Sequence, residues 1–308
     1  MARAQLELGE LAISRFVHAA PGRSIAVETL AGPPWSWRHD ADVPRPAASL
    51  LKVPLAIAVH RAAATGRIDL GCPVRVDELP TSRFASVLDV FAPEHELTLR
   101  ELCGFALATS DNRAARHLLA LVGTEAVNDA LHAAGCAGSR MAVGYADDEL
   151  GPAGRANVTT AADMLGLLRF LHEREALAEV VLAMERNPLN ARIPLRLPDD
   201  GRIAVANKTG SLAGVVDEVA LIRDDGLVLA VAVLCDGQDD NARAAIDIGD
   251  CVRDVWAGVG GRLDPCSARP SWSTATRCPR RSAPATGRGP CAGCCPARPA
   301  TMPTTPCS

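Results

Sequence analysis

Apolar positions follow a helical period through the middle of the chain and strand-like runs near both ends. The helical spacing predicts helices over residues 6–19, 49–65, 98–108, 111–121, 124–134 and 160–172. Two short strands are expected at 24–30 and 35–40, on either side of a Gly-Pro-Pro turn. After residue 192 the pattern becomes β-type, with strands at 203–207, 217–223 and 227–234 and a closing helix at 241–257.

This order of elements predicts an α/β fold of the α+β kind. One antiparallel sheet is built from both chain ends and flanked by helices, and an all-helical region is inserted between them. We expect a domain over residues 1–263, with the sheet region at about 1–48 and 195–263 and the helical region at about 49–194. No internal repeat is found in the sequence.

The last 45 residues, 264–308, differ sharply from the rest because they contain no Leu, Ile, Val or Phe but nine Pro and six Cys. Such a segment cannot bury enough apolar surface to offset its ordering entropy, so we predict a disordered tail. A shifted reading frame in GC-rich DNA would give the same composition. The cysteine cluster at 291–295 lacks a second CxxC pair or a His pair, so no metal or other cofactor is expected.

Composition narrows the possible partners. Hydrophobic residues make up 48% of the chain, and without the tail 26 basic and 35 acidic residues remain, a net charge of about −9. An acidic domain argues against a nucleic-acid surface. The longest apolar stretch, residues 227–235, is about half of the roughly 18 residues that a membrane helix needs. We expect a monomeric protein that binds a small molecule and, as the sequence is written, a cytoplasmic one, exported only if the true start lies upstream.

Lysine is nearly absent, since only Lys52 and Lys208 stand among 32 basic residues. Lys52 lies three residues after Ser49 at the start of an apolar helix, so its amine is within reach of the serine hydroxyl. A serine hydroxyl is a weak nucleophile until a base takes its proton, and a lysine can be that base whereas an arginine cannot. Ser-x-x-Lys alone is weak evidence, but in a chain with two lysines it is far less expected by chance.

Two further clusters could carry chemistry, although each has a purely structural interpretation. Ser110-Asp111-Asn112 lies between two predicted helices, where Ser110 or Asp111 could simply cap the second one. Lys208-Thr209-Gly210-Ser211 follows a predicted strand and could be an exposed edge with a turn glycine.

Taken together, the three clusters resemble a known motif set. Ser-x-x-Lys, Ser-Asp-Asn 61 residues on and Lys-Thr-Gly 98 residues further, in this order, are typical of class A β-lactamases and penicillin-binding proteins. The chain therefore resembles the class A-like serine β-lactamase family over about residues 5–260.

The resemblance implies a serine hydrolase that forms an acyl-enzyme on Ser49 and hydrolyses a β-lactam amide. Lys52 would be the base or proton relay for Ser49. Ser110 would pass a proton to the leaving nitrogen, and Lys208 would hold that hydroxyl and the substrate carboxylate.

The same resemblance implies the substrate contacts. Asn112 would bind the side-chain amide of the substrate, and Thr209 its carboxylate. Gly210 belongs to the same substrate-binding strand, and the backbone N–H groups of Ser49 and Ser211 would form the oxyanion hole.

Deacylation is where the sequence departs from the family. Class A enzymes use a loop glutamate followed four residues later by asparagine, whereas here Glu149 is followed at that spacing by Ala153. Asp147 or Glu149 could be the deacylation base, or both could lie in a solvated acidic loop. No arginine stands just before Asp217, where the family often binds the substrate carboxylate. A penicillin-binding D-alanyl carboxypeptidase or esterase with slow deacylation, or a non-catalytic ligand sensor, therefore remains an alternative.

Overall fold

The structure is a computed structural model that describes residues 3–145, 153–189, 191–199 and 201–263. The predicted tail at 264–308 lies outside the described residues, as do the two acidic candidates Asp147 and Glu149. None of the helices among the described residues is long and apolar enough to cross a membrane.

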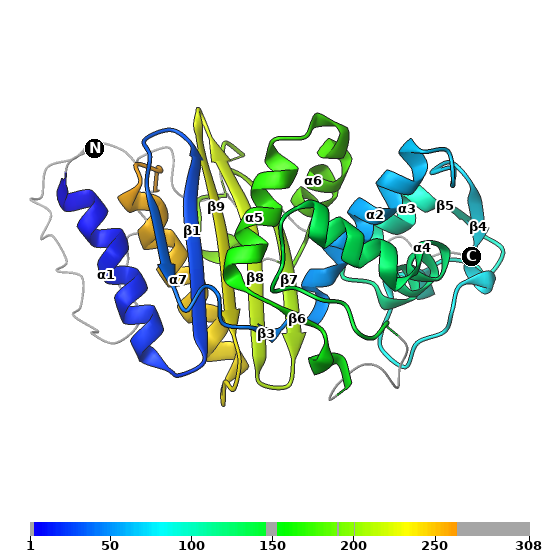
Figure 1. Cartoon of the computed structure of the whole chain (residues 1–308), viewed down its shortest axis with the longest axis horizontal. Helices are drawn as coiled ribbons and strands as arrows, with labels where there is room; N and C mark the ends of the chain where they lie inside the picture. Colours follow the sequence, from blue (N-terminus) through cyan, green and yellow to red (C-terminus); the bar gives the residue numbers. More distant parts are fainter. Residues whose placement is uncertain (1–2, 146–152, 190, 200, 264–308) are drawn as a thin grey trace, which may run out of the picture. The chain divides into compact units, whose positions relative to one another are not determined.

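A five-stranded sheet joins the two ends of the domain, in the order β2-β1-β9-β8-β7 (Figure 1). Every neighbouring pair is antiparallel. The strands are β1 (Arg23–Ala31), β2 (Ser36–His39), β7 (Ala204–Leu212), β8 (Val215–Asp224) and β9 (Leu227–Cys235). The predicted sheet built from both chain ends is therefore confirmed.

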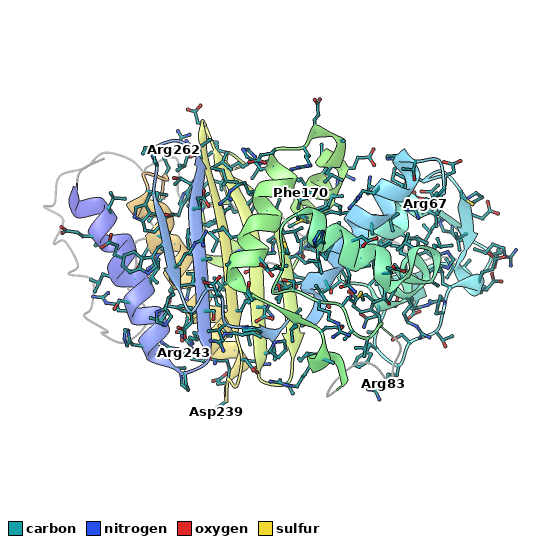
Figure 2. The ribbon with its side chains drawn as sticks, viewed as in Figure 1. Arg67, Arg83, Phe170, Asp239, Arg243 and Arg262 are labelled. Carbon is teal, nitrogen blue, oxygen red and sulfur yellow. The ribbon has the colours of Figure 1, made fainter. Side chains whose placement is uncertain are left out.

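Helices cover both faces of this sheet because the strands alternate two sets of apolar side chains. On β9, Val231 and Val233 belong to the core beneath α1 (Arg3–Ala19) and α7 (Asn241–Gly258). Ala232 belongs to the core on the opposite face, beneath α5 (Ala161–His172), the helix on which Figure 2 labels Phe170.

The inserted region consists of helices packed around α2 (Lys52–Ala64), whose side chains are mostly buried. Around it lie α3 (Leu99–Ala108), α4 (Asn112–Ala133) and α6 (Ala178–Glu185). The two helices predicted at 111–121 and 124–134 meet in α4 at Gly123, whose φ of 79° and ψ of 159° interrupt the helix. The sequence pattern missed α6, since eight residues give too few turns for a period to be visible.

Short elements complete the domain. Two small ladders pair β3 (Arg45–Pro46) with β6 (Val158–Thr159) and β4 (Pro73–Arg75) with β5 (Glu96–Thr98). The single-turn 3₁₀ helices are η1 (Ala48–Leu51), η2 (Val76–Glu78), η3 (Val87–Val90), η4 (Ala153–Ala156), η5 (Glu175–Leu177) and η6 (Pro194–Arg196). Segments of two to four residues are too short for an alternation of apolar and polar positions to predict them.

Two helical glycines provide a matched test of the packing. A Cβ added at Gly104 in α3 would meet no atom within 4 Å, whereas at Gly249 in α7 it would lie 2.6 Å from the carbonyl oxygen of Arg192. We expect Gly104→Ala to raise the free energy of unfolding by about 0.5–1 kcal/mol, because alanine favours helix over glycine. Gly249→Ala should lower it despite the same helical preference. Urea denaturation measures both, and shifts of the same sign would contradict this packing.

Candidate active site

Ser49 lies in η1, which contacts both the edge strand β7 and helix α2. Its neighbours Leu50 and Leu51 are fully buried, and this burial anchors the turn. A Cβ added at Gly210 would meet the Ala47 oxygen at 3.3 Å and Leu50 Cγ at 3.2 Å, so the absence of a side chain lets β7 approach η1 closely. Ala48 adopts a φ of 44°, a left-handed conformation that costs a non-glycine residue about 1–3 kcal/mol. Backbone strain thus lies directly beside the serine.

The Lys52 amine joins the first two sequence motifs. Its Nζ donates to the carbonyl oxygen of Ser110 at 2.6 Å and to Asn112 Oδ1 at 2.7 Å. It also lies 3.2 Å from the hydroxyl oxygens of both Ser49 and Ser110. The structure therefore brings together Ser49, Lys52, Ser110 and Asn112, as the sequence predicted.

Burial allows the Lys52 amine to lose its proton near neutral pH. Lys52 is completely buried, and loss of hydration lowers the pKa of its amine to about 7, although the charge of Asp111 acts in the opposite direction. A neutral amine has two N–H donors and one lone pair. The two shortest contacts are to atoms that can only accept, so they take both N–H groups and leave the lone pair for the proton of the Ser49 hydroxyl.

The loop that carries Ser110 is held by the carboxylate of Asp111. One carboxylate oxygen caps α4 by accepting from the Ala114 N–H at 3.0 Å. The other accepts from the Ser86 hydroxyl at 2.5 Å and from the Val87 N–H at 3.1 Å. These bonds keep Ser110 at a φ of 58°, a second strained residue in the site. The capping interpretation is thus correct for Asp111, and it is compatible with a functional Ser110.

Lys208 does not lie on an exposed edge or at the end of a strand. It lies within β7 and is fully buried, because η1 covers this part of the edge strand. Its Nζ donates to the carbonyl oxygen of Thr209 at 2.8 Å, and no hydrogen bond joins it to Ser110 among the described residues. Burial first, then the positive charges of Lys52 and Arg192, holds the pKa of the Lys208 amine well below its usual value.

Arg192 places a guanidinium beside β7, although the sequence shows no arginine just before Asp217. Its guanidinium donates to the Ser211 hydroxyl at 2.6 Å, to the Gly210 carbonyl at 3.1 Å and to the carbonyl of Asp217. Sequence reasoning missed this residue because it comes from the turn before β7 and not from the neighbouring strand. The Ile193-Pro194 pair directly after it is a local signal that could have marked this turn.

A buried carboxylate fixes that turn. Glu218 accepts from the Ile193 N–H at 2.7 Å and from Asn207 Nδ2 at 2.6 Å. Burial raises the pKa of Glu218 to about 7, although both hydrogen bonds and the charge of Arg192 act to lower it. Glu218 therefore ties the Arg192 turn to β7 and β8 at the mouth of the site.

An aromatic ring covers the Lys52 amine. The ring centroid of Tyr145 lies 5.1 Å from Lys52 Nζ, and the tyrosine side chain is buried. Tyr145 lies just before the segment 146–152, and the structure places its ring against the lysine. The described residues hold no group of three His, Cys, Asp or Glu side chains that could bind a metal ion.

Comparison with solved structures supports the fold. The chain is 28% identical to a β-lactamase from Sphaerobacter thermophilus DSM 20745, with a TM-score of 0.73 over 82% of this chain and 97% of that one. A β-lactamase from Chitinophaga pinensis DSM 2588 (22% identity, TM-score 0.71, 81% and 98% covered) has the same fold. So does the acyl-enzyme complex of a PBP-A mutant with penicillin G (20% identity, TM-score 0.69, 82% and 94% covered). No curated protein matches the chain.

The family comparison covers the whole catalytic region. A model of the beta-lactamase enzyme family matches residues 10–259, a range that includes every motif residue described above. The chain therefore belongs to the beta-lactamase enzyme family of class A-like serine hydrolases.

Proposed function

We propose that the protein hydrolyses the amide bond of β-lactams through an acyl-enzyme on Ser49. The observation that carries the proposal is the buried Lys52 amine, 3.2 Å from the hydroxyls of both Ser49 and Ser110. One base thus reaches the nucleophile and the group that can protonate the leaving nitrogen.

Acylation then follows from the contacts of Lys52. The neutral amine takes the proton of Ser49 while the serine oxygen forms a bond to the lactam carbonyl carbon. The backbone N–H groups of Ser49 and Ser211 stabilise the oxyanion of the tetrahedral intermediate. When the C–N bond breaks, Ser110 gives its proton to the nitrogen and regains one from the Lys52 ammonium, which restores the neutral amine.

Substrate binding follows from the polar groups on and beside β7. Thr209 and Ser211 offer hydroxyls, and Arg192 already donates to the Ser211 hydroxyl at 2.6 Å. This arginine would attract the carboxylate of a β-lactam, and the buried Lys208 amine lies on the same strand as those hydroxyls. The side-chain carbonyl oxygen of Asn112 accepts a hydrogen bond from Lys52, so its NH₂ group remains to donate to the acyl amide of the substrate.

A second candidate is a penicillin-binding carboxypeptidase or esterase that deacylates slowly. It is favoured by one observation: Glu149 is followed four residues later by Ala153, where class A enzymes have asparagine. Mass spectrometry of the protein after mixing with penicillin separates the two. Rapid loss of the Ser49 adduct supports β-lactam hydrolysis, and an adduct that persists for hours supports the second candidate.

Removing the nucleophile is the first test. We expect Ser49→Ala to abolish hydrolysis of a chromogenic cephalosporin, because the proposed acyl-enzyme bond forms on the Ser49 hydroxyl. Ser36→Ala, at an exposed serine on β2, is the matched control and should keep full activity. Unchanged turnover by a folded Ser49→Ala protein would overturn the proposal.

Replacing the base while keeping its charge is the second test. Lys52→Arg should slow acylation by about 10²–10⁴-fold, since a guanidinium stays protonated and cannot take the serine proton. In the unmodified protein, acylation should rise with pH and level off above about 7, as the amine loses its proton. Lys208→Arg is the control, with a milder expected loss because it leaves the Lys52 base in place. Stopped-flow acylation rates across pH measure all three, and equal losses in both variants would argue against a base at Lys52.

The role of Arg192 predicts an effect on substrate binding. Arg192→Gln should raise KM for a carboxylate-bearing β-lactam by about 10-fold to 100-fold, the value of a lost charged hydrogen bond, and change kcat little. The methyl ester of the same substrate lacks the carboxylate, so its KM should rise far less. An equal rise for acid and ester would assign Arg192 a purely structural role.

A further inference from the structure

Tyr145 is buried beside Lys52, and hydrogen bonding of its hydroxyl does not explain this burial. The side chain is 3% exposed, yet its hydroxyl has no hydrogen-bond partner among the described residues. Leaving a buried hydroxyl unpaired typically costs about 1–3 kcal/mol. The position of this residue therefore depends on the packing of its ring.

The segment that ends in Tyr145 is held firmly from the other side of the loop. The side chain of Asn157 accepts from the N–H groups of Ala142 and Val143, at 2.7 and 3.0 Å, and donates to the Val143 carbonyl at 3.1 Å. The carbonyl of Asn157 accepts from the Ala47 N–H at 2.8 Å, two residues before Ser49. One residue thus connects the tyrosine segment to the turn that carries the nucleophile.

The ring lies where water would otherwise reach the amine. Ser49, Ser110 and Asn112 surround Nζ with oxygens, and the Tyr145 ring lies against it with its centroid at 5.1 Å. With these neighbours the lysine is 0% exposed.

We propose that Tyr145 is a positioning residue whose ring shields the Lys52 amine from water and so keeps it able to act as a base. The proposal rests on the function proposed above and names a specific determinant of that site.

Two effects of the ring oppose each other. The face of an aromatic ring attracts an ammonium by about 0.5–2 kcal/mol, which favours the protonated lysine. Exclusion of water favours the neutral amine, the direction in which burial lowers the pKa of Lys52 to about 7.

The other charged groups around the amine do not by themselves account for the lowered pKa of Lys52. Asp111, at the start of α4, raises the pKa of Lys52, and the positive charge of Lys52 in turn lowers the pKa of Lys208 in β7. Both remain in place when Tyr145 is changed. Removal of the ring should therefore let water in and move the pKa of Lys52 towards its usual value.

The chain is well suited to a direct measurement, because it contains two lysines and one tyrosine. Protein labelled with ¹³C-lysine gives two side-chain signals, and Lys208→Arg assigns them. Titrated by NMR, Tyr145→Phe should leave the pKa of Lys52 within about 0.3 units of the unmodified protein, while Tyr145→Ala should raise it by at least about one unit, equivalent to 1.36 kcal/mol. The pH at which penicillin acylation reaches half its maximal rate should move in parallel.

The outcomes separate this proposal from the proposed function. The titration needs no catalysis, so it tests the ring even if no β-lactam is hydrolysed. An unchanged Lys52 pKa in Tyr145→Ala overturns the proposal, even where acylation persists. If the alanine variant fails to fold, Tyr145→Gln fills the space with a polar chain and should give the same rise, whereas an unchanged value there would also overturn the proposal. Absorbance of the single tyrosine should show a neutral phenol throughout, since burial raises its pKa.

Discussion

The site depends on the burial of two lysine amines in one small volume. Lys52 and Lys208 are both completely buried, and neither forms an ion pair with a carboxylate among the described residues. Burial of an unpaired ammonium is so costly that the amine neutralises instead, and for Lys208 the positive charge of Lys52 adds to this effect. The loss of hydration that lowers the free energy of unfolding also lowers the pKa of Lys52, so that its amine can act as a base near neutral pH. An exposed lysine would remain protonated and could not take a proton from Ser49.

The rest of the fold can be understood as the support for this burial. The sheet positions Lys208 on β7, helix α2 begins at Lys52, and Gly210 lets the strand lie against the turn between them. Asp111 and Glu218 each tie a loop of the site to a neighbouring element. The carboxylates lie around the amines at positions where they hold backbone, and the direct contacts of Lys52 are to neutral oxygens. This separation preserves a low lysine pKa.

In the proposed function, substrate recognition and catalysis use different basic side chains. The guanidinium of Arg192 reaches the hydroxyl of Ser211, where a substrate carboxylate would bind. Lys52 must lose its charge to react. In the proposed mechanism, this arginine-rich chain with lysine at only two positions thus uses a guanidinium to bind the substrate and a neutral amine to accept the proton.

The sequence alone determined the sheet built from both chain ends, most of the helices and the three motifs, because periodic apolar positions and local spacing are properties of neighbouring residues. Ser-x-x-Lys places two groups on one helical face, so their contact could be predicted from spacing. The break at Gly123 was predictable for the same reason. Only the tertiary structure decided that Lys208 is buried, that Arg192 reaches β7 from a distant turn and that Tyr145 covers Lys52. These three features set the charge and hydration of the site, and they depend on residues far apart in sequence whose packing no local pattern records.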